Sequence, residues 1–268
     1  MNIVPEIIFI VPYRNREVHR EVFMKIMPEI LEGLNYGIFF IHQNDKRPFN
    51  RGAVKNLGFK YVKKIYPLKY KNITLVFNDI DCMAYKKNQF SYQTNENEIN
   101  HFYGFKHTLG GIFSIKAKNF EEINGFANIW TWGLEDNILL KRVLKKKFII
   151  TRTQFIDHDK GEYKKLILLR HENKRLINRH IVDKFTNDND YDGINSITNI
   201  KYGDIIELKN NIYEINIINF DIPEKSDANY VKNSSYIEPY KYTFVQKHKL
   251  GSAKTFGKQI DNKNFMLF

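Results

Sequence analysis

Apolar residues in the first 80 positions of the chain alternate between two spacings. Residues 7–12 form a continuous apolar run, which is typical of a strand buried on both faces. Residues 17–34 instead repeat an apolar side chain every four positions, which predicts a helix. The pattern also predicts strands over 36–42 and 73–79 and a helix over 53–65. This alternation predicts an α/β fold with an open, mostly parallel sheet and helices on both faces.

The second half of the chain adds fewer elements. Its pattern predicts a short amphipathic helix over 135–144 and a strand over 148–151. Alternating apolar residues over 199–220 predict an antiparallel hairpin around a Lys-Asn-Asn turn. The alternation weakens after that hairpin. We therefore expect one domain over residues 1–220 and an irregular, basic extension over 221–268 that is not an independent domain.

Composition agrees with a folded domain and excludes several classes of protein. The chain has 268 residues, of which 43% are hydrophobic, so it is neither wholly disordered nor fibrous. Its one cysteine, Cys82, excludes an intrachain disulfide and allows a cytosol-like, reducing compartment. No basic segment followed by an apolar one opens the chain, and no run approaches the ~18–20 apolar residues that cross a bilayer. We expect a soluble protein without a signal peptide or a membrane anchor.

The positive charge is concentrated in one segment. The chain carries 42 Lys and Arg against 30 Asp and Glu, a formal net charge of +12. Residues 141–184 alone hold 14 basic and 5 acidic residues. Such a segment indicates either an anionic ligand nearby or a solvated basic surface, and charge does not decide between them.

Charged residues follow the predicted parallel strands. Arg14 and Arg16 come directly after the first strand, and Asp79 and Asp81 end the third. Because residues i and i+2 of a strand share a side, we expect the two carboxylates to converge. They would form an oxygen site for Mg²⁺ or Mn²⁺ that holds a diphosphate, with the guanidinium groups beside it. The alternative is that an acidic pair simply terminates a strand.

A second cluster combines aromatic and acidic residues. Trp130, Trp132 and Gly133 directly precede Glu135 and Asp136, which open a predicted helix. Indole rings stack on sugar faces, and a carboxylate can accept a hydroxyl proton. A helix N-terminus also favours carboxylates for electrostatic reasons alone. From these residues alone, a catalytic site and a simple helix start are equally good interpretations.

Ordered motifs along the chain resemble those of the β-1,4-galactosyltransferase family, glycosyltransferase family 7. The motifs are VPYRNREVH at 11–19, FNRGA at 49–53 with NLGF at 56–59, VFNDID at 76–81, GG at 110–111, INGF at 123–126, WTWGLED at 130–136 and DGINSI at 192–197. Together they cover roughly residues 4–220 in the family's order. Several motifs in order are far more specific than any one of them.

The resemblance implies a GT-A glycosyltransferase fold, which is Rossmann-like, and a UDP-sugar-dependent hexosyltransferase. The implied reaction moves galactose or N-acetylgalactosamine, or another hexose, to a hydroxyl of a glycan or glycoprotein, with inversion at the anomeric carbon. The implied cofactor is Mn²⁺ or Mg²⁺. No nucleic-acid partner is expected.

The same resemblance implies roles for individual residues. Residues similar to the donor-binding positions of the family are Pro12, Tyr13, Arg14, Arg16, Phe49, Arg51, Asp79, Ile80 and Thr108. The acceptor-binding positions correspond to Trp132, Gly133, Glu135 and Asp136. Asp136 would be the catalytic base, with Glu135 beside it. Asp81 and His158 would bind the metal.

Departures from the family pattern leave parts of the site open. His171 is an alternative to His158 as the metal ligand, and Phe155 stands where animal members have a methionine ligand. Asp157 or water could complete the shell. Thr108 aligns with a bulky residue that resembles a gate at the 2-position of the donor sugar, so an N-acetyl group would fit there. At the acceptor side, Leu134 and Asn137 replace a Gly and an Asp of animal members, so an N-acetylglucosamine acceptor is not implied.

Two other functions remain possible from the sequence. One is a non-catalytic sugar- or polyanion-binding protein that uses the basic segment, although a polyanion binder gains nothing from acids in its groove. The other is a polysaccharide-synthase-type GT-A domain, which the pair Asp157 and His158 suggests.

Overall fold

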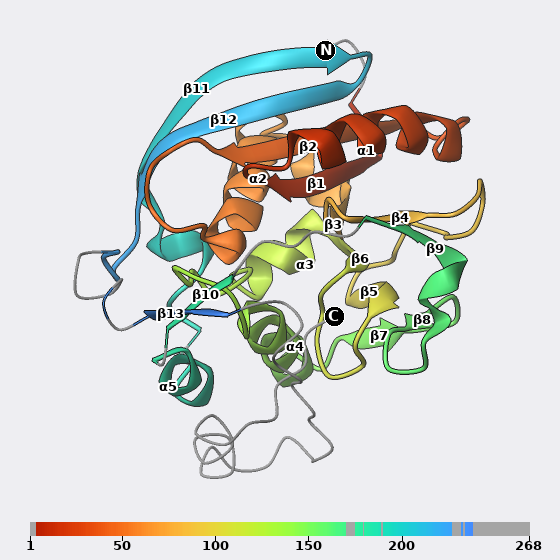
Figure 1. Ribbon diagram of the computed structural model, residues 1–268. Helices are drawn as coiled ribbons and strands as arrows, with labels where there is room; N and C mark the ends of the chain where they lie inside the picture. Colours follow the sequence, from red (N-terminus) through yellow and green to blue (C-terminus); the bar gives the residue numbers. More distant parts are fainter. Residues whose placement is uncertain are drawn as a thin grey trace.

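The continuous apolar runs form the centre of a mixed sheet (Figure 1). The computed structural model describes residues 4–169, 175–178, 180–188, 190–226, 232 and 234–237. Strands β1 (Ile7–Tyr13), β2 (Tyr36–Gln43) and β3 (Thr74–Asn78) lie side by side and parallel, with β1 in the middle. Every residue of β1 and β3 is buried. The three predicted strands are confirmed.

Further strands extend the sheet on both sides. The order across the nine-stranded sheet is β11-β12-β2-β1-β3-β6-β5-β7, with β8 paired to β5. β12 is parallel to β2, whereas β6 is antiparallel to both β3 and β5. The predicted hairpin is confirmed as the antiparallel pair β11 and β12. The bounds are Glu98–Gly104 for β5, Ile112–Lys116 for β6, Ile149–Thr151 for β7, Ile156–Asp157 for β8, Thr198–Lys209 for β11 and Ile212–Asp221 for β12.

Helices cover both faces of the sheet, as predicted. α1 (Glu17–Ile30) packs on one face through Phe23 and Met27, together with the apolar residues of β4 (Cys82–Ala84). The opposite face is covered by three helices that share one core cluster. They are α2 (Arg51–Ile65), α3 (Ala117–Glu122) and α4 (Glu135–Lys145). This arrangement confirms the α/β fold class.

Short elements complete the described chain. β4 pairs with β9 (Leu166–Leu168), and β10 (Arg175–Asn178) pairs with β13 (Ser234–Ile237), so a strand follows residue 221. The remaining elements are η1 (Tyr70–Asn72), η2 (Glu162–Lys165), α5 (Ile181–Thr186) and η3 (Ile194–Ser196). Within the described ranges, no helix combines the length and the apolar character needed to cross a membrane.

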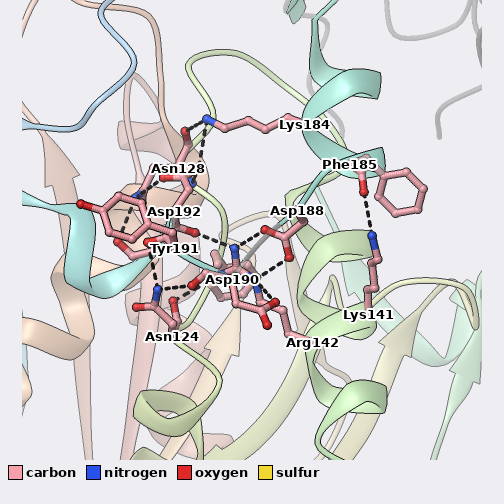
Figure 2. Close-up of polar contacts among 12 residues, drawn as sticks. Asn124, Asn128, Lys141, Arg142, Lys184, Phe185, Asp188, Asp190, Tyr191 and Asp192 are labelled. Atoms are coloured by element: carbon pink, nitrogen blue, oxygen red, sulfur yellow. Dashed lines mark hydrogen bonds and ion pairs between the residues drawn. The ribbon is translucent and has the colours of Figure 1, made fainter. Parts of the chain in front are cut away.

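A buried arginine of α4, Arg142, anchors this helix to neighbouring loops (Figure 2). The Arg142 guanidinium forms a bidentate pair with Asp188, at 3.0 Å from Nε to Oδ2 and 2.6 Å from Nη2 to Oδ1. It also donates to the carbonyl oxygens of Gly125 and Asp192. Bidentate charge-assisted bonds of this kind fix geometry as well as adding stability. They hold the helix whose first turn carries Glu135 and Asp136.

Candidate active site

The N-termini of α2 and α4 meet beside the turn that follows β3. Asn50 caps α2, because its side-chain oxygen accepts a hydrogen bond from the Ala53 amide at 2.9 Å. Gly52 lets the helix approach its neighbour, since a Cβ there would lie 2.1 Å from the carbonyl oxygen of Ala127. The first residue of α2, Arg51, is thereby held against the first turn of α4.

Arg51 joins three carboxylates. Its Nη2 lies 2.5 Å from Asp79 Oδ2, and its Nη1 lies 2.5 Å from Glu135 Oε1 and 3.0 Å from Asp136 Oδ2. Burial lowers the pKa of Arg51, but Asp136, Asp79 and Glu135 outweigh it and raise this pKa well above the usual value. The guanidinium therefore stays charged at the centre of the cluster, although the sequence predicted only a donor-binding role for it.

Glu135 and Asp136 have different environments. The Glu135 side chain is buried, whereas that of Asp136 is 15% exposed. Burial raises the pKa of Glu135, the Asp136 carboxylate adds to the rise, and Arg51 offsets part of it. Two neighbouring carboxylates in different environments often have distinct roles in proton transfer.

A glycine shapes the space behind Asp136. A Cβ on Gly110 would lie 2.4 Å from Asp136 Oδ2, so the carboxylate occupies room that only glycine leaves free. The Leu109 amide next to it donates to the Asp136 carbonyl oxygen at 3.1 Å. These contacts bring the predicted pair of glycines and the predicted acids together across 25 residues of sequence.

The strand geometry that was assumed for Asp79 and Asp81 is wrong. β3 ends at Asn78, and residues 79–81 form a turn that leads into β4, with the Cys82 amide donating to the Asp79 carbonyl oxygen. The alternation of a strand therefore does not apply. Asp79 pairs with Arg51. Burial lowers the pKa of Arg16, and the charges of Asp81 and Glu17 partly offset this lowering.

The two arginines after β1 also separate. Arg14 lies against the loop after β2, where it donates to the carbonyl oxygens of Asp45, at 2.8 Å, and of Arg47. Asp81 is among the charges that act on Arg16, whereas those acting on Arg14 are Asp45 and Arg47. Tyr13 belongs to the core under the α1 face, because its ring contacts Phe40 and its hydroxyl donates to Glu17 at 3.2 Å. In this structure the side chains of Arg14 and Tyr13 thus contact other parts of the protein.

The predicted metal ligand His158 follows the short strand β8. Its Nδ1 lies 2.9 Å from the Tyr103 hydroxyl, and its ring lies 4.5 Å from that of Phe105. Burial lowers the pKa of His158, so the imidazole is neutral near pH 7. Burial raises the pKa of Tyr103, with smaller contributions from Cys82, Asp81 and Asp79, so this tyrosine is close both to the acidic turn and to His158.

Asp157 and His171 are the other candidate metal ligands. Asp157 is buried, lies 3.5 Å from the Lys106 ammonium, and accepts a hydrogen bond from the Asp159 amide. His171 lies outside the residues that the structure describes. Within the described part of the chain, no group of three His, Cys, Asp or Glu residues could hold a metal ion by itself.

The two tryptophans have separate places. Trp130 is buried, stacks on Phe220 at 5.3 Å between ring centroids, and donates to the Glu224 carbonyl oxygen, so it is a core residue. Trp132 is half-buried, and its amide donates to the Leu176 carbonyl oxygen at 2.8 Å. Of the two indoles, only that of Trp132 remains a candidate for sugar contact.

The remaining predicted positions are partly or fully buried. Phe49 is partly buried against the core that contains α2, while Pro12 and Ile80 are buried. Gly133 has a φ of +115°, which favours glycine. Thr108 is 9% exposed, and its hydroxyl donates to the Phe105 carbonyl oxygen at 3.3 Å.

One charged residue of the cluster is not among the positions that the sequence predicted. Lys55 lies one turn after Arg51 on α2, is 1% exposed, and places its Nζ 3.2 Å from Asp136 Oδ1. The available signal was a lysine within the apolar stripe of a predicted core helix, between Val54 and Leu57.

Sequence models of one family match consecutive parts of the chain. The model of the N-terminal region of glycosyl transferase group 7 matches residues 3–94. The model of the N-terminal domain of galactosyltransferase matches residues 91–172.

Curated relatives carry the same family name. Beta-1,4-galactosyltransferase 4 of Cricetulus griseus is 30% identical over 174 residues, which are 60% of this chain and 48% of the relative. Beta-1,4-galactosyltransferase 6 of Homo sapiens is 27% identical over 202 residues, which are 70% of this chain and 50% of the relative. The chain thus spans about half the length of these relatives.

Solved structures share the fold. The catalytic domain of Drosophila β-1,4-galactosyltransferase 7, in complex with xylobiose, matches with a TM-score of 0.65 and 21% identity, over 85% of this chain and 98% of that chain. A mutant of that protein, in complex with manganese, UDP-Gal and xylobiose, matches with a TM-score of 0.61 and 20% identity, over the same shares of the two chains. The chain therefore has a GT-A glycosyltransferase fold and belongs to glycosyltransferase family 7, the family of the β-1,4-galactosyltransferases.

Proposed function

We propose that the protein is a metal-dependent, inverting glycosyltransferase. It transfers galactose, N-acetylgalactosamine or another hexose from a UDP-sugar to a hydroxyl of a glycan or glycoprotein. The observation that carries this proposal is the cluster in which Arg51 joins Asp79, Glu135 and Asp136. A non-catalytic binder has no need of three carboxylates around one partly buried guanidinium.

Asp136 is the proposed base. It is the more exposed of the two acids at the start of α4, and Arg51 fixes one of its oxygens. Each carboxylate oxygen has a second lone pair, so a held carboxylate can still accept the proton of an attacking hydroxyl. General base catalysis of this kind typically contributes ~10²–10⁴-fold to a rate. Glu135, with its raised pKa, is proposed to contact the acceptor beside Trp132 and Gly133.

Asp81 and His158 are the proposed metal ligands. If the His158 Nδ1–H donates to the Tyr103 hydroxyl, Nε2 carries the lone pair that a metal requires. A carboxylate oxygen and a neutral imidazole suit Mn²⁺, with water and diphosphate oxygens as the remaining ligands. When bound, the metal would act as a Lewis acid that neutralises charge on the departing UDP. The Drosophila relative, in complex with manganese and UDP-Gal, supports this choice of cofactor and donor.

The donor pocket is proposed to lie between β1 and the turn after β3. Arg16, beside Asp81, is the arginine best placed for the diphosphate, because Arg14 is engaged by the loop after β2. The remaining proposed contacts of the UDP-sugar are with Pro12, Tyr13, Phe49, Arg51, Asp79, Ile80 and Thr108. The xylobiose in the Drosophila structures supports a glycan hydroxyl as the acceptor.

The proposal is tested by incubating the protein with a panel of UDP-sugars and measuring UDP release. We expect release with Mn²⁺ that stops when EDTA is added, and faster release once an acceptor from a glycan array is supplied. A polyanion or sugar binder would release no UDP from any donor. Transfer that builds a long polymer would favour the polysaccharide-synthase alternative.

The Gly110→Ala substitution tests the position of the base. The added methyl group would lie 2.4 Å from Asp136 Oδ2, so the carboxylate must move. Because a 1 Å misplacement can cost ~10²-fold, we expect kcat to fall at least ~10-fold. The control is Gly37→Ala in β2, where the nearest atom to the new Cβ is 3.5 Å away. Equal kcat values for both variants in the UDP-release assay would show that Asp136 does not need this position.

The Thr108→Tyr substitution tests the choice of donor. Discrimination between UDP-hexoses requires a side chain that fills the space of an N-acetyl group, and Thr108 is small. It directly precedes Leu109, which bonds the backbone of Asp136. We expect the wild type to use UDP-N-acetylgalactosamine at least as well as UDP-galactose, and Thr108→Tyr to lose the first donor selectively. Measured kcat/KM values decide this, and a wild-type preference of several hundred-fold for UDP-galactose would contradict it.

A further inference from the structure

The side chain of Lys55 lies on the buried side of α2, close to apolar residues. Lys55 is 1% exposed and has Val54 and Leu57, both fully buried, on the same helix. The ring of Phe126 lies 4.4 Å from its Nζ. Removing an ammonium from water is costly unless an opposite charge compensates it, so the partners of Lys55 decide what it does.

Those partners are two carboxylates of the cluster. Nζ of Lys55 lies 3.2 Å from Asp136 Oδ1 and 3.8 Å from Asp79 Oδ1. Arg51 meanwhile holds Asp136 Oδ2 at 3.0 Å. The two oxygens of Asp136 are therefore held by two different cations, both from α2 and one helical turn apart.

We propose that Lys55 is a positioning residue for Asp136: its buried ammonium keeps this carboxylate ionised and correctly oriented until it takes the proton of the acceptor. The inference rests on the function proposed above. The proton passes from the acceptor hydroxyl to Asp136, and Lys55 takes no part in the transfer. Once Asp136 is neutral, the nearest carboxylate to the ammonium is that of Asp79.

The charges around Asp136 support this role. Arg51 and Lys55 pair with it from α2, and Glu135 lies next to it on α4. The same two cations also pair with Asp79, from the turn after β3. The Cys82 thiol near Asp79 is uncharged, because burial raises its pKa well above the usual value. The cluster thus contains two cations and three carboxylates. Without Lys55, one cation would remain, and the proton would bind Asp136 more readily from solvent.

The Lys55→Met substitution tests the role, because methionine keeps the length and removes the charge. We measure the pH dependence of kcat with UDP-galactose and the affinity for UDP in the presence of Mn²⁺. We expect the acid limb to move at least one pH unit upward, kcat to fall about 10-fold, and UDP affinity to stay within about 3-fold. Lys55→Arg, which keeps the charge, should return the acid limb toward the wild-type position.

Lys64→Met is the matched control, since this lysine is exposed on the same helix. It should leave the pH profile and kcat unchanged. An unchanged acid limb in Lys55→Met, or an equal shift in Lys55→Arg, would overturn the proposal. If the wild type itself turns over no UDP-sugar, the proposed function fails, and this result is distinct from an unshifted profile in an active enzyme.

A second measurement needs no turnover and no fold-perturbing change at Lys55. ¹H–¹⁵N spectra tuned to lysine ammonium groups detect those that exchange slowly because they are buried and paired. We expect the wild type to show such a signal, and Asp136→Asn to shift or remove it while Asp204→Asn, an exposed site on β11, leaves it in place. A signal that is insensitive to Asp136→Asn would refute the ion pair on which the role depends.

Discussion

Replacing Asp136 with asparagine lowers kcat by at least ~10²-fold and leaves the binding of UDP and metal intact. Asparagine keeps the shape of the side chain but cannot accept the proton of the attacking hydroxyl, so the base is lost. The ion pairs with Arg51 and Lys55 also end, yet Asp79 and Glu135 remain as partners of Arg51. Steady-state kinetics with UDP-galactose and titration calorimetry with UDP and Mn²⁺ measure the two effects separately.

Glu135→Gln is the control for this assignment. Glu135 is buried, so the substitution weakens the proposed contact with the acceptor and removes the charge that pairs with Arg51. We expect it to raise KM for the acceptor more than it lowers kcat. A larger loss of kcat in Glu135→Gln than in Asp136→Asn, with binding intact in both, would exchange the two roles.

Replacing Asp81 with asparagine abolishes the stimulation of turnover by Mn²⁺. Asp81 lies in the turn after β3 and is half-buried, and a neutral amide is a much weaker ligand for a hard cation. The fold should lose little stability, because the residue is in a turn and outside the core. Turnover measured over a series of Mn²⁺ concentrations, with thermal unfolding in parallel, tests both expectations.

Asp204→Asn serves as the matched control, because it changes the same group on an exposed strand of the sheet edge. It should respond to Mn²⁺ like the wild type. Mn²⁺ activation in Asp81→Asn equal to that of the control would remove Asp81 from the metal site.

The central elements of the fold could be predicted because their signals are local. The apolar residues of β1 and of α2 indicate by their spacing alone that these segments are buried. β5 and β6 were not predicted. They are as long as β1 and β3, but β5 includes Asn100 and His101, which interrupt the apolar pattern. β6 also pairs with β3, which lies far from it in sequence, and such a contact leaves no local pattern.

The members of the acidic cluster could also be predicted, but their contacts could not. The ordered motifs pointed to Arg51, Asp79, Glu135 and Asp136, and the structure places all four within one network. The side on which a residue lies depends on backbone conformation that the sequence pattern does not show. Alternation along a strand was assumed for residues 79–81, and a turn there gives the two carboxylates different neighbours.

Side-chain direction explains the remaining differences. Trp130 and Trp132 are two positions apart, yet Thr131 between them has a φ of +136°, so the backbone turns and one indole enters the core. Arg14 reaches the loop after β2 because that loop lies beside the end of β1 in the folded sheet. Lys55 could only be interpreted once its neighbours Asp136 and Asp79 were known.

The most direct measurement follows UDP-galactose, Mn²⁺ and xylobiose by ¹H NMR, with acceptors from the glycan array in parallel. We expect UDP to appear together with a β-linked galactoside, because single displacement inverts the α-configured donor. Both products should be absent with EDTA and reduced at least ~10²-fold in Asp136→Asn. An α-linked product, or no UDP from any UDP-sugar with any acceptor, would contradict inverting glycosyl transfer at this cluster.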